Sequence, residues 1–531
     1  MKKAVTIFFL LVFYAGTAQV SKVWVADNGD NTYKNPIIHA DYSDPDAIRV
    51  GNDYYMIASS FDAVPCLPIL HSKDLVNWTV IGHALQKQIP IEHFSQAQHG
   101  NGVWAPSIRY HNKEFYIYYP DPDFGIYLTR AKNISGPWSD PVLVQEGKGL
   151  IDPCPLWDDD GKVYLVHAFA GSRAGIKSII IVKRLNAEGT KVIDDGVLVY
   201  DGHEKDPTIE GPKFYKRNGW YYIFAPAGGV STGWQLVLRS KKIYGPYERK
   251  VVMDQGSTKI NGPHQGAWVT TQENENWFIH FQDKDAYGRV VHLQPMKWIN
   301  DWPVIGEDKD GDGKGEPVLI YKKPNVGMTF PIQTPQESDE FDKTTMGLQW
   351  QWQANPKPTW SFLTGASLRL YSQKNPDSAK NYWDVPNIIL QKFPSDEFTA
   401  TAKCDFKPRL DGEKMGFIIM GLDYAYLSLT KKTDGIYLSY VECRQADKGR
   451  SENEKLIGKL SSTAIFQVKV SAGAKCQFSY SVDGINYTNA GEIFSAQPGR
   501  WVGAKVGFFC SRPVQTNDAG YADFDWFRIE K

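Results

Sequence analysis

A strand–turn–strand unit recurs five times within roughly the first 300 residues of this chain. Its clearest copy, residues 207–224, has an Asn218-Gly219 turn between two apolar, aromatic-rich runs, which is the strongest short-range signal of a β-hairpin. Successive copies are 48 to 61 residues apart when they are aligned on one aromatic each, namely Tyr55, Tyr116, Tyr164, Tyr222 and Phe278. Strand-rich repeats of this length predict a five-bladed β-propeller with four strands in each blade.

Three of the five copies carry an acid at the same place. Asp44, Asp152 and Glu210 each lie 11 or 12 residues before the aromatic of their own copy. Equivalent positions of rotationally repeated blades face the same axis, so we expect these carboxyls to converge on the central channel. A single acid before Pro or Gly often only ends a strand, but like charges gathered on one axis cost stability unless they have a use.

The composition excludes some function classes. A chain of 531 residues can hold two or more domains with full-sized cores. Its formal net charge of −1 provides no basic excess to attract phosphate, so we expect no nucleic-acid partner. The aromatic content of 13%, which includes 17 Trp, fits large β cores and also platforms for sugar rings.

The first 18 residues have the pattern of a secretory signal peptide. Lys2 and Lys3 precede an apolar run over residues 4–14, and small residues then lead to Ala18. Cleavage after Ala18 would export the mature chain to the periplasm or the medium. No other segment is long and apolar enough to span a membrane.

The pattern changes after the predicted propeller. Residues 19–321 form the expected catalytic domain, in which residues 35–38 open the first blade, and the Pro-rich residues 322–335 form a linker. Residues 336–531 contain repeated short runs of alternating polar and apolar residues, with turn signals such as Asp483-Gly484. The whole chain is therefore predicted to be all-β, with an antiparallel β-sandwich after the propeller.

Two further patterns do not predict a metal site. The six cysteines contain no Cys-x-x-Cys pair, which argues against structural zinc, and the four after residue 400 could pair with one another. Residues 308–313 resemble the start of a calcium loop. The twelfth position of that loop is Leu319 instead of a bidentate acid, which favours a solvated acidic turn.

Three carboxyls in an aromatic-rich channel of an exported protein indicate carbohydrate chemistry. Glycoside hydrolysis needs one carboxyl to protonate the leaving oxygen and another to activate water or attack the sugar. Each proton transfer contributes about a hundredfold to ten-thousandfold. Positioning aromatics and polar contacts must therefore supply the rest of the acceleration.

Residues 35–305 resemble glycoside hydrolase family 43, whose members are five-bladed propellers that invert the anomeric centre. Residues 336–531 resemble the concanavalin-like, jelly-roll sandwich of its β-xylosidase and α-L-arabinofuranosidase branch. The resemblance depends on six ordered motifs at blade spacing, Ser43-Asp44-Pro45-Asp46, Val103-Trp104-Ala105-Pro106, Ile151-Asp152-Pro153, Ile209-Glu210-Gly211-Pro212, Gly262-Pro263-His264-Gln265-Gly266 and residues 288–295.

The resemblance implies a division of roles among the acids. Asp44 corresponds to the general base that activates water, and Glu210 to the general acid. Asp152 corresponds to a third carboxylate that orients the acid and raises its pKa, which agrees with the effect of a neighbouring anion. An inverting pair must leave room for water, so Asp44 and Glu210 should be about 6.5 to 9.5 Å apart.

Other matching residues would bind the substrate. Phe61 and Trp104 would form the wall of the sugar subsite, and Arg289 would bind sugar hydroxyls, although it could instead be a structural ion-pair partner. His264 corresponds to a histidine that in many relatives helps hold a calcium ion or water, and it could equally be a hydrogen-bonded core residue. No cofactor is required by this resemblance, and a structural Ca²⁺ is left open.

The function expected is exo-acting, inverting release of terminal α-L-arabinofuranosyl or β-D-xylosyl units from plant hemicellulose oligosaccharides. An aromatic loop of the sandwich, at residues 499–501, would close the pocket around a chain end. Residues 61–66 and 98–102 depart from the β-xylosidase pattern. The preference for an arabinofuranoside or a xyloside is therefore left open. The alternatives are an endo-arabinanase with an open cleft and a carbohydrate-binding propeller without catalysis.

Overall fold

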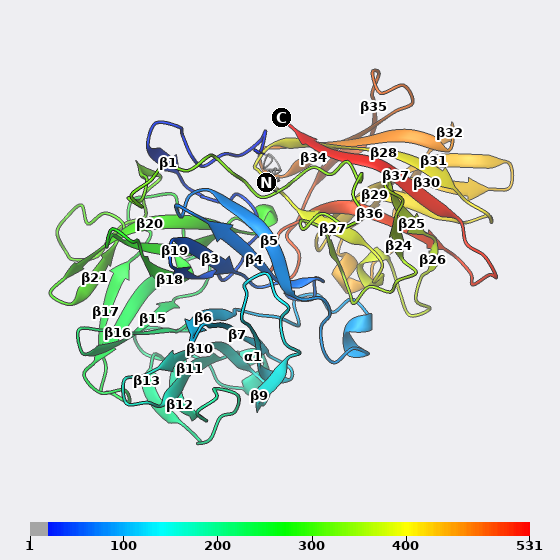
Figure 1. Cartoon of the computed structure of the whole chain (residues 1–531). Coiled ribbons are helices and arrows are strands. Elements are labelled where there is room, and N and C mark those ends of the chain that lie inside the picture. Colours follow the sequence, from blue (N-terminus) through cyan, green and yellow to red (C-terminus); the bar gives the residue numbers. More distant parts are fainter. Residues whose placement is uncertain (1–19) are drawn as a thin grey trace, which may run out of the picture.

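The computed structural model describes residues 20–531, which form two β domains (Figure 1). The propeller is coloured blue to green and the sandwich yellow to red. The predicted signal peptide, residues 1–18, lies outside the described residues. Within residues 20–531, no helix is long and apolar enough to cross a membrane. The prediction of an all-β chain with a five-bladed propeller and a sandwich is confirmed.

Each blade is an antiparallel sheet of four consecutive strands. The first two blades contain β2 (Asp46–Val50), β3 (Asp53–Ile57), β4 (Cys66–Ser72) and β5 (Trp78–Leu85), then β6 (Ser107–His111), β7 (Glu114–Asp121), β8 (Gly125–Ala131) and β9 (Val142–Glu146). The next two contain β10 (Leu150–Trp157), β11 (Val163–Phe169), β12 (Ile179–Leu185) and β13 (Val197–Asp201), then β14 (Lys213–Arg217), β15 (Trp220–Ala227), β16 (Trp234–Ser240) and β17 (Glu248–Met253). The fifth contains β18 (His264–Thr270), β19 (Asn276–Asp283), β20 (Arg289–Ile299) and β21 (Trp302–Ile305).

The first strand of each blade is the one that lies nearest the axis. Strand β2 contacts β6, β6 contacts β10, and β10 contacts β14, while β18 of the last blade returns to β2. Tight turns then connect successive strands of a blade, which follow one another outward from the axis. Asn218 and Gly219, for example, have φ values of 51° and 71°, as a type I′ hairpin turn requires.

The ring closes differently from the expectation. Residues 35–38 are predicted to open the first blade, but Ile38 instead forms an isolated bridge with Val291 of the fifth blade. The Asn35 side chain donates to the carbonyl of Leu293 and accepts from its N–H, both at 2.8 Å. Every blade consists of four strands that are consecutive in the chain. The ring is therefore closed by these contacts, and within residues 20–531 no N-terminal strand completes the sheet of the last blade.

The C-terminal domain consists of two sheets. One contains β23 (Gln351–Trp352), β26 (Gln373–Lys374), β27 (Ile389–Lys392), β29 (Lys414–Met420), β30 (Tyr424–Lys432), β31 (Gly435–Cys443), β32 (Asn453–Leu460) and β36 (Lys505–Arg512). The other contains β24 (Ser361–Leu363), β25 (Leu368–Tyr371), β28 (Phe398–Lys407), β33 (Thr463–Ser471), β34 (Lys475–Ser481), β35 (Thr488–Ser495) and β37 (Tyr521–Glu530). Their alternate apolar side chains pack face to face in one core, as expected of a sandwich.

The remaining elements are short. Strands β1 (Thr32–Lys34) and β22 (Ile320–Lys322) pair with each other beside the fifth blade. The helical turns are α1 (Gly171–Ala174), η1 (His93–Ser95), η2 (Asp285–Tyr287), η3 (Tyr382–Asp384) and η4 (Ala446–Lys448).

The six cysteines are buried and unpaired. The pairing left open for the four cysteines after residue 400 is therefore absent from the structure. Burial raises the pKa of Cys404, Cys476 and Cys510 to about 12 in each case. These thiols therefore behave as small apolar side chains of the sandwich core.

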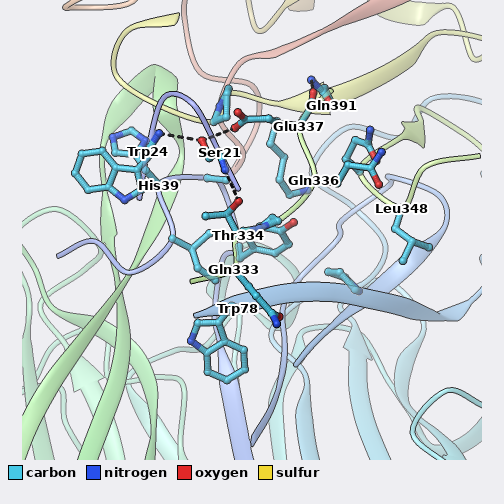
Figure 2. A pocket seen from close by; sticks show the side chains of 18 of the residues that line it. Ser21, Trp24, His39, Trp78, Gln333, Thr334, Gln336, Glu337, Leu348 and Gln391 are labelled. Carbon is cyan, nitrogen blue, oxygen red and sulfur yellow. Dashed lines mark hydrogen bonds between the residues drawn. The ribbon is translucent and has the colours of Figure 1, made fainter. Parts of the chain in front are cut away.

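The two domains contact each other through backbone as well as side chains. Val64 and Trp352 exchange two backbone hydrogen bonds, of 3.0 and 2.6 Å. Elsewhere a cavity lies between the domains, where Ser21 Oγ donates to Glu337 Oε2 (Figure 2). Gln391 lines this cavity, and its Nε2 donates to the Glu337 carbonyl at 2.9 Å. The sandwich is thus attached to the propeller along an extended interface.

Candidate active site

The three acids lie on or next to the first strands of the first, third and fourth blades. Asp44 lies two residues before β2, Asp152 lies within β10, and Glu210 lies three residues before β14. Charge interactions of Asp152 with both Glu210 and Asp44 show that the three carboxyls lie together. The structure therefore places these side chains, far apart in sequence, in one site at the propeller axis.

An unusual backbone conformation directs two of these acids. Asp44 and Asp152 have φ values of 56° and 57°, in the left-handed region that non-glycine residues rarely adopt. Asp152 also lies at a break in register between β10 and β11, where Ile151 and Cys154 are the flanking paired residues. Such irregularities redirect a side chain, and they are common beside active sites.

Three donors surround the buried carboxylate of Asp44. The hydroxyls of Ser43 and Ser59 donate to its Oδ2, at 2.8 and 2.5 Å. Arg289 Nη1 lies 3.3 Å from its Oδ1 and also donates to Ser43 Oγ at 2.8 Å. A buried charge is costly unless it is paired and hydrogen-bonded, and these contacts meet that requirement.

Asp152 is held in a different environment. It is 1% exposed, and the backbone N–H of Gly211 donates to its Oδ2 at 2.7 Å. Burial, together with the negative charges of Glu210 and Asp44, raises the pKa of Asp152 to about 8. The carboxyl of Asp152 is more deeply buried than that of Glu210, whose side chain is 23% exposed.

Glu210 is the more accessible acid and has a histidine partner. His264 Nε2 lies 2.8 Å from Glu210 Oε1, and the His264 side chain is fully buried. Its Nδ1 has no hydrogen-bond partner among residues 20–531. The structure thus places His264 against the acid, where it can orient the carboxyl.

Aromatic side chains from both domains gather beside the acids. The rings of Phe61 and Trp104 meet edge to face with centroids 6.3 Å apart. Trp501, on the loop before β36 of the sandwich, meets Trp104 in the same way at 6.3 Å. The Trp104 indole N–H donates to the carbonyl of Gly100 at 2.8 Å. The sandwich therefore adds an aromatic side chain to the propeller site.

Arg289 joins the acids to these aromatics. Besides its contact with Asp44, its guanidinium lies 4.9 Å from the centroid of Phe281 and 5.9 Å from that of Trp501. Its backbone N–H donates to Asp41 Oδ1 at 3.0 Å, and Asp41 Oδ2 accepts from Gly503 of the sandwich at 2.9 Å. Arg289 is thus an ion-pair partner of Asp44 that also faces aromatic side chains of both domains.

Sequence reasoning did not single out Ser59 or Gln265. Ser59 gives no sequence signal, because a serine after a strand is common. Gln265 stands inside the motif quoted above, and its blade position, 13 residues before Phe278, is the signal that could have identified it. Sequence comparison between blades can therefore find such a residue even when its type is unremarkable.

The acidic turn at residues 308–312 is separate from this site. Asp308, Asp310 and Asp312 bring ligand oxygens within 4.8 Å of one another. Asp308 Oδ1 and Oδ2 accept from the backbone N–H groups of Gly311 and Gly313, at 2.8 and 3.0 Å. The side chain of Asp308 thus stabilises the turn itself.

Known proteins match both domains in the same order. The model of the glycosyl hydrolases family 43 matches residues 33–303. The model of the beta xylosidase C-terminal concanavalin A-like domain matches residues 338–530. A putative beta-xylosidase of Xylanibacter ruminicola is 41% identical over 493 residues, which cover 92% of this chain and 88% of the relative.

Two further relatives cover almost the whole chain. A non-reducing end alpha-L-arabinofuranosidase of Bacteroides ovatus is 28% identical, over 95% of this chain and 96% of the relative. The crystal structure of a xylan beta-1,4-xylosidase from Bacillus halodurans has a TM-score of 0.82 at 25% identity and covers 94% of this chain and all of its own. Because both domains match in order and over nearly their full length, this chain belongs to glycosyl hydrolase family 43 and is an exo-acting glycosidase.

Proposed function

We propose that the enzyme removes terminal β-D-xylosyl or α-L-arabinofuranosyl units from plant hemicellulose oligosaccharides, such as those of xylan, arabinoxylan or xyloglucan, with inversion. The observation that carries the proposal is the grouping of Asp44, Asp152 and Glu210 beside the first strands of three blades, where the residue after Glu210 donates to Asp152 and aromatic rings lie nearby. The names of the relatives, beta-xylosidase and alpha-L-arabinofuranosidase, support the two substrate classes.

Asp44 acts as the general base in this proposal. Its Oδ2 is held by Ser43 and Ser59 and its Oδ1 by Arg289, so the carboxylate keeps one orientation toward the sugar. It accepts a proton from the water that attacks the anomeric carbon. Arg289, which also faces Phe281 and Trp501, donates to substrate hydroxyls.

Glu210 acts as the general acid. Burial of Asp152 and its repulsion with Glu210 oppose full ionisation of the pair until the pH reaches about 8. A proton therefore stays within the pair at neutral pH. Glu210, the more exposed member, delivers it to the leaving oxygen, and the hydrogen bond with His264 fixes the direction of delivery.

The aromatic wall explains how a chain end is selected. Phe61 and Trp104 of the propeller face the sugar ring, and Trp501 of the sandwich covers the edge of Trp104. A Cβ on Gly100 would lie 2.6 Å from the Arg500 side chain, so the two domains meet closely at this point. These contacts support a closed site that admits one terminal unit, whereas an endo-arabinanase needs an open cleft.

The proposal is tested with nitrophenyl α-L-arabinofuranoside, nitrophenyl β-D-xylopyranoside and xylobiose. We expect turnover of at least one nitrophenyl pentoside by the wild type. Proton NMR of the first-formed sugar should show the anomer opposite to that of the substrate. Inactivity on both pentosides would contradict the substrate class, and a first product of retained configuration would contradict inversion.

Export forms part of the same proposal. Lys2 and Lys3, the apolar run and Ala18 support a cleaved signal that directs the enzyme to the periplasm or the medium, where oligosaccharides are encountered. Mass spectrometry of the mature N-terminus tests it. A mature protein that still begins at residue 1 in the cytoplasmic fraction would contradict it.

Calcium fits poorly as a part of this site. Calcium takes six to eight oxygen ligands, whereas the oxygens named around His264 are those of the Glu210 carboxylate, already hydrogen-bonded to His264 Nε2, and the unpartnered Gln265 Oε1. Among residues 20–531, the one cluster of three acidic, His or Cys side chains able to hold a metal is the distant acidic turn. We therefore assign no catalytic step to a metal ion and propose that none is required.

A further inference from the structure

Gln265 has the same backbone features as the acids of the site. It lies at the break in register between β18 and β19, where His264 and Gly266 are the paired neighbours. Its φ is 38°, in the left-handed region that also contains Asp44 and Asp152. A strained residue at an irregular strand position is held there by its surroundings, and its side chain is redirected.

The blade repeat places Gln265 where the acids are. Gln265 lies 13 residues before the reference aromatic of its blade, and the acids lie 11 or 12 residues before theirs. The fifth blade therefore contributes a carboxamide at the level where the first, third and fourth contribute carboxyls. A direct contact supports this position, because a Cβ on Gly211 would lie 2.7 Å from Gln265 Cγ. Gly211 is the residue whose N–H donates to Asp152.

The carboxamide oxygen of Gln265 is left without a partner. The residue is 5% exposed, and its Oε1 has no hydrogen-bond partner among residues 20–531. An unsatisfied buried polar group costs about 1 to 3 kcal/mol, so it is expected to have a partner when the site is in use.

We propose that Gln265 binds two neighbouring hydroxyls of the terminal pentose through its carboxamide. An amide offers one acceptor and two donors side by side. Its Oε1 accepts from one hydroxyl, and its Nε2 donates to the next. This inference rests on the proposed pentosidase function and deepens it, because it predicts that the terminal unit must carry an unmodified diol.

A second buried glutamine provides a matched comparison. Gln391 is 3% exposed, and its Oε1 is also unpartnered among the described residues. Its Nε2, however, donates to the Glu337 carbonyl, and its side chain lines the cavity between the domains (Figure 2), whose lining includes none of the three acids. Both side chains have similar burial and one unpartnered oxygen, but only Gln265 lies in the repeat position of the acids.

The test compares Gln265→Met with the wild type on the nitrophenyl pentoside that the wild type cleaves best, and on its 2-deoxy and 3-deoxy analogues, each of which lacks one hydroxyl of the neighbouring pair that both pentose types share. Met keeps the side-chain size and removes both amide atoms. We expect kcat/KM for the parent substrate to fall about tenfold or more. Removal of a hydroxyl that Gln265 binds should weaken the wild type strongly and the variant little, a non-additivity that a loss of fold cannot mimic.

Gln391→Met is the control and should retain the wild-type pattern across the three substrates. If Gln265→Met does not fold, Gln265→Glu retains the acceptor and loses the donor, and it should lose the preference for one of the two hydroxyls. Additive losses on both analogues, or an unchanged kcat/KM for Gln265→Met, would overturn the inference. In that case wild-type turnover of the pentoside still supports the proposed function, whereas absence of turnover contradicts the function itself.

Discussion

His264 Nε2 lies 2.8 Å from Glu210 Oε1. Within residues 20–531, this is the one hydrogen bond between the Glu210 carboxyl and another side chain. The histidine is buried beneath the more exposed acid. A fully buried ring is fixed by packing and therefore orients the carboxyl that it contacts. In the proposed mechanism, His264 is thus a positioning residue for the general acid Glu210.

His264→Ala should lower kcat by about tenfold to a hundredfold on xylobiose. The loss should be smaller on a nitrophenyl pentoside, whose leaving group needs little protonation. A structural role alone would lower both activities equally. Steady-state kinetics on the two substrates separate these cases, and His264→Asn, which retains a donor, should recover part of the loss.

Glu210→Ala should follow the same pattern more strongly. Loss of the general acid removes about a hundredfold to ten-thousandfold of kcat on xylobiose, with a smaller loss on nitrophenyl substrates. Glu248→Ala is a suitable control, because Glu248 is a surface acid on β17, the outer strand of the same blade, and pairs with Arg239 of β16. Equal losses on both kinds of substrate would contradict the role of Glu210 in protonating the leaving group.

The raised pKa of Asp152 predicts how stability depends on pH. The folded protein retains this proton up to about pH 8, whereas the unfolded chain releases it near pH 4. The contribution of the Asp152 proton to the free energy of unfolding is therefore complete below about pH 4, and it decreases as the pH rises toward 8. Asp152→Asn cannot ionise, so its Tm should exceed that of the wild type by about 2 °C or more at pH 8 and approach it near pH 4.

The same proton should control activity on the alkaline side. As the pH rises through about 8, the Asp152–Glu210 pair loses its proton, and kcat/KM of the wild type should fall. Initial rates on a nitrophenyl pentoside and on xylobiose from pH 5 to 10 measure this, with the sharper fall expected on xylobiose. A flat profile through pH 9 would contradict the assignment.

Trp501→Ala should open the edge of the pocket. The side chain is 47% exposed and contacts Trp104 and Arg289, so its loss removes aromatic contact area without a large core defect. We expect KM for xylobiose to rise about tenfold, with a Tm close to that of the wild type. Trp526→Ala, on the terminal strand of the sandwich, is the matched control and should leave KM unchanged.

Removal of metal ions should not affect turnover. EDTA dialysis of the enzyme should leave kcat and KM unchanged, because the residues near His264 supply too few oxygen ligands to build a calcium cage. Loss of activity that returns on addition of Ca²⁺ and not of Mg²⁺ would overturn this expectation. Thermal unfolding with and without EDTA reports separately on the acidic turn at residues 308–312.

The sequence predicts the propeller well because blade repeats leave a periodic signal. The aromatics from Tyr55 to Phe278 mark equivalent strands, and this equivalence is what brings Asp44, Asp152 and Glu210 together. Their individual environments do not follow from spacing. The environment of each carboxyl depends on contacts between residues that are distant in the sequence, such as that of Gly211 with Asp152.

Other features could not be predicted from local pattern. Strand β30 lacks the alternation that identifies a half-buried strand, because residues 424–429 are all buried. Residues 35–38 look like the beginning of a blade, yet they pair with the fifth blade, since ring closure depends on long-range packing. Ser59 contacts Asp44 across 15 residues of intervening chain, which no motif indicates.

The shared carboxylate of Asp41 limits how far the two domains can be treated as exchangeable modules. One of its oxygens accepts from Arg289 and the other from Gly503, so the arginine beside Asp44 is anchored through a residue of the C-terminal domain. An excised propeller would lose this anchor together with Trp501. Chimeras that graft a foreign sandwich onto this catalytic ring would therefore need to reproduce the Gly503 loop, and not merely a matching interface.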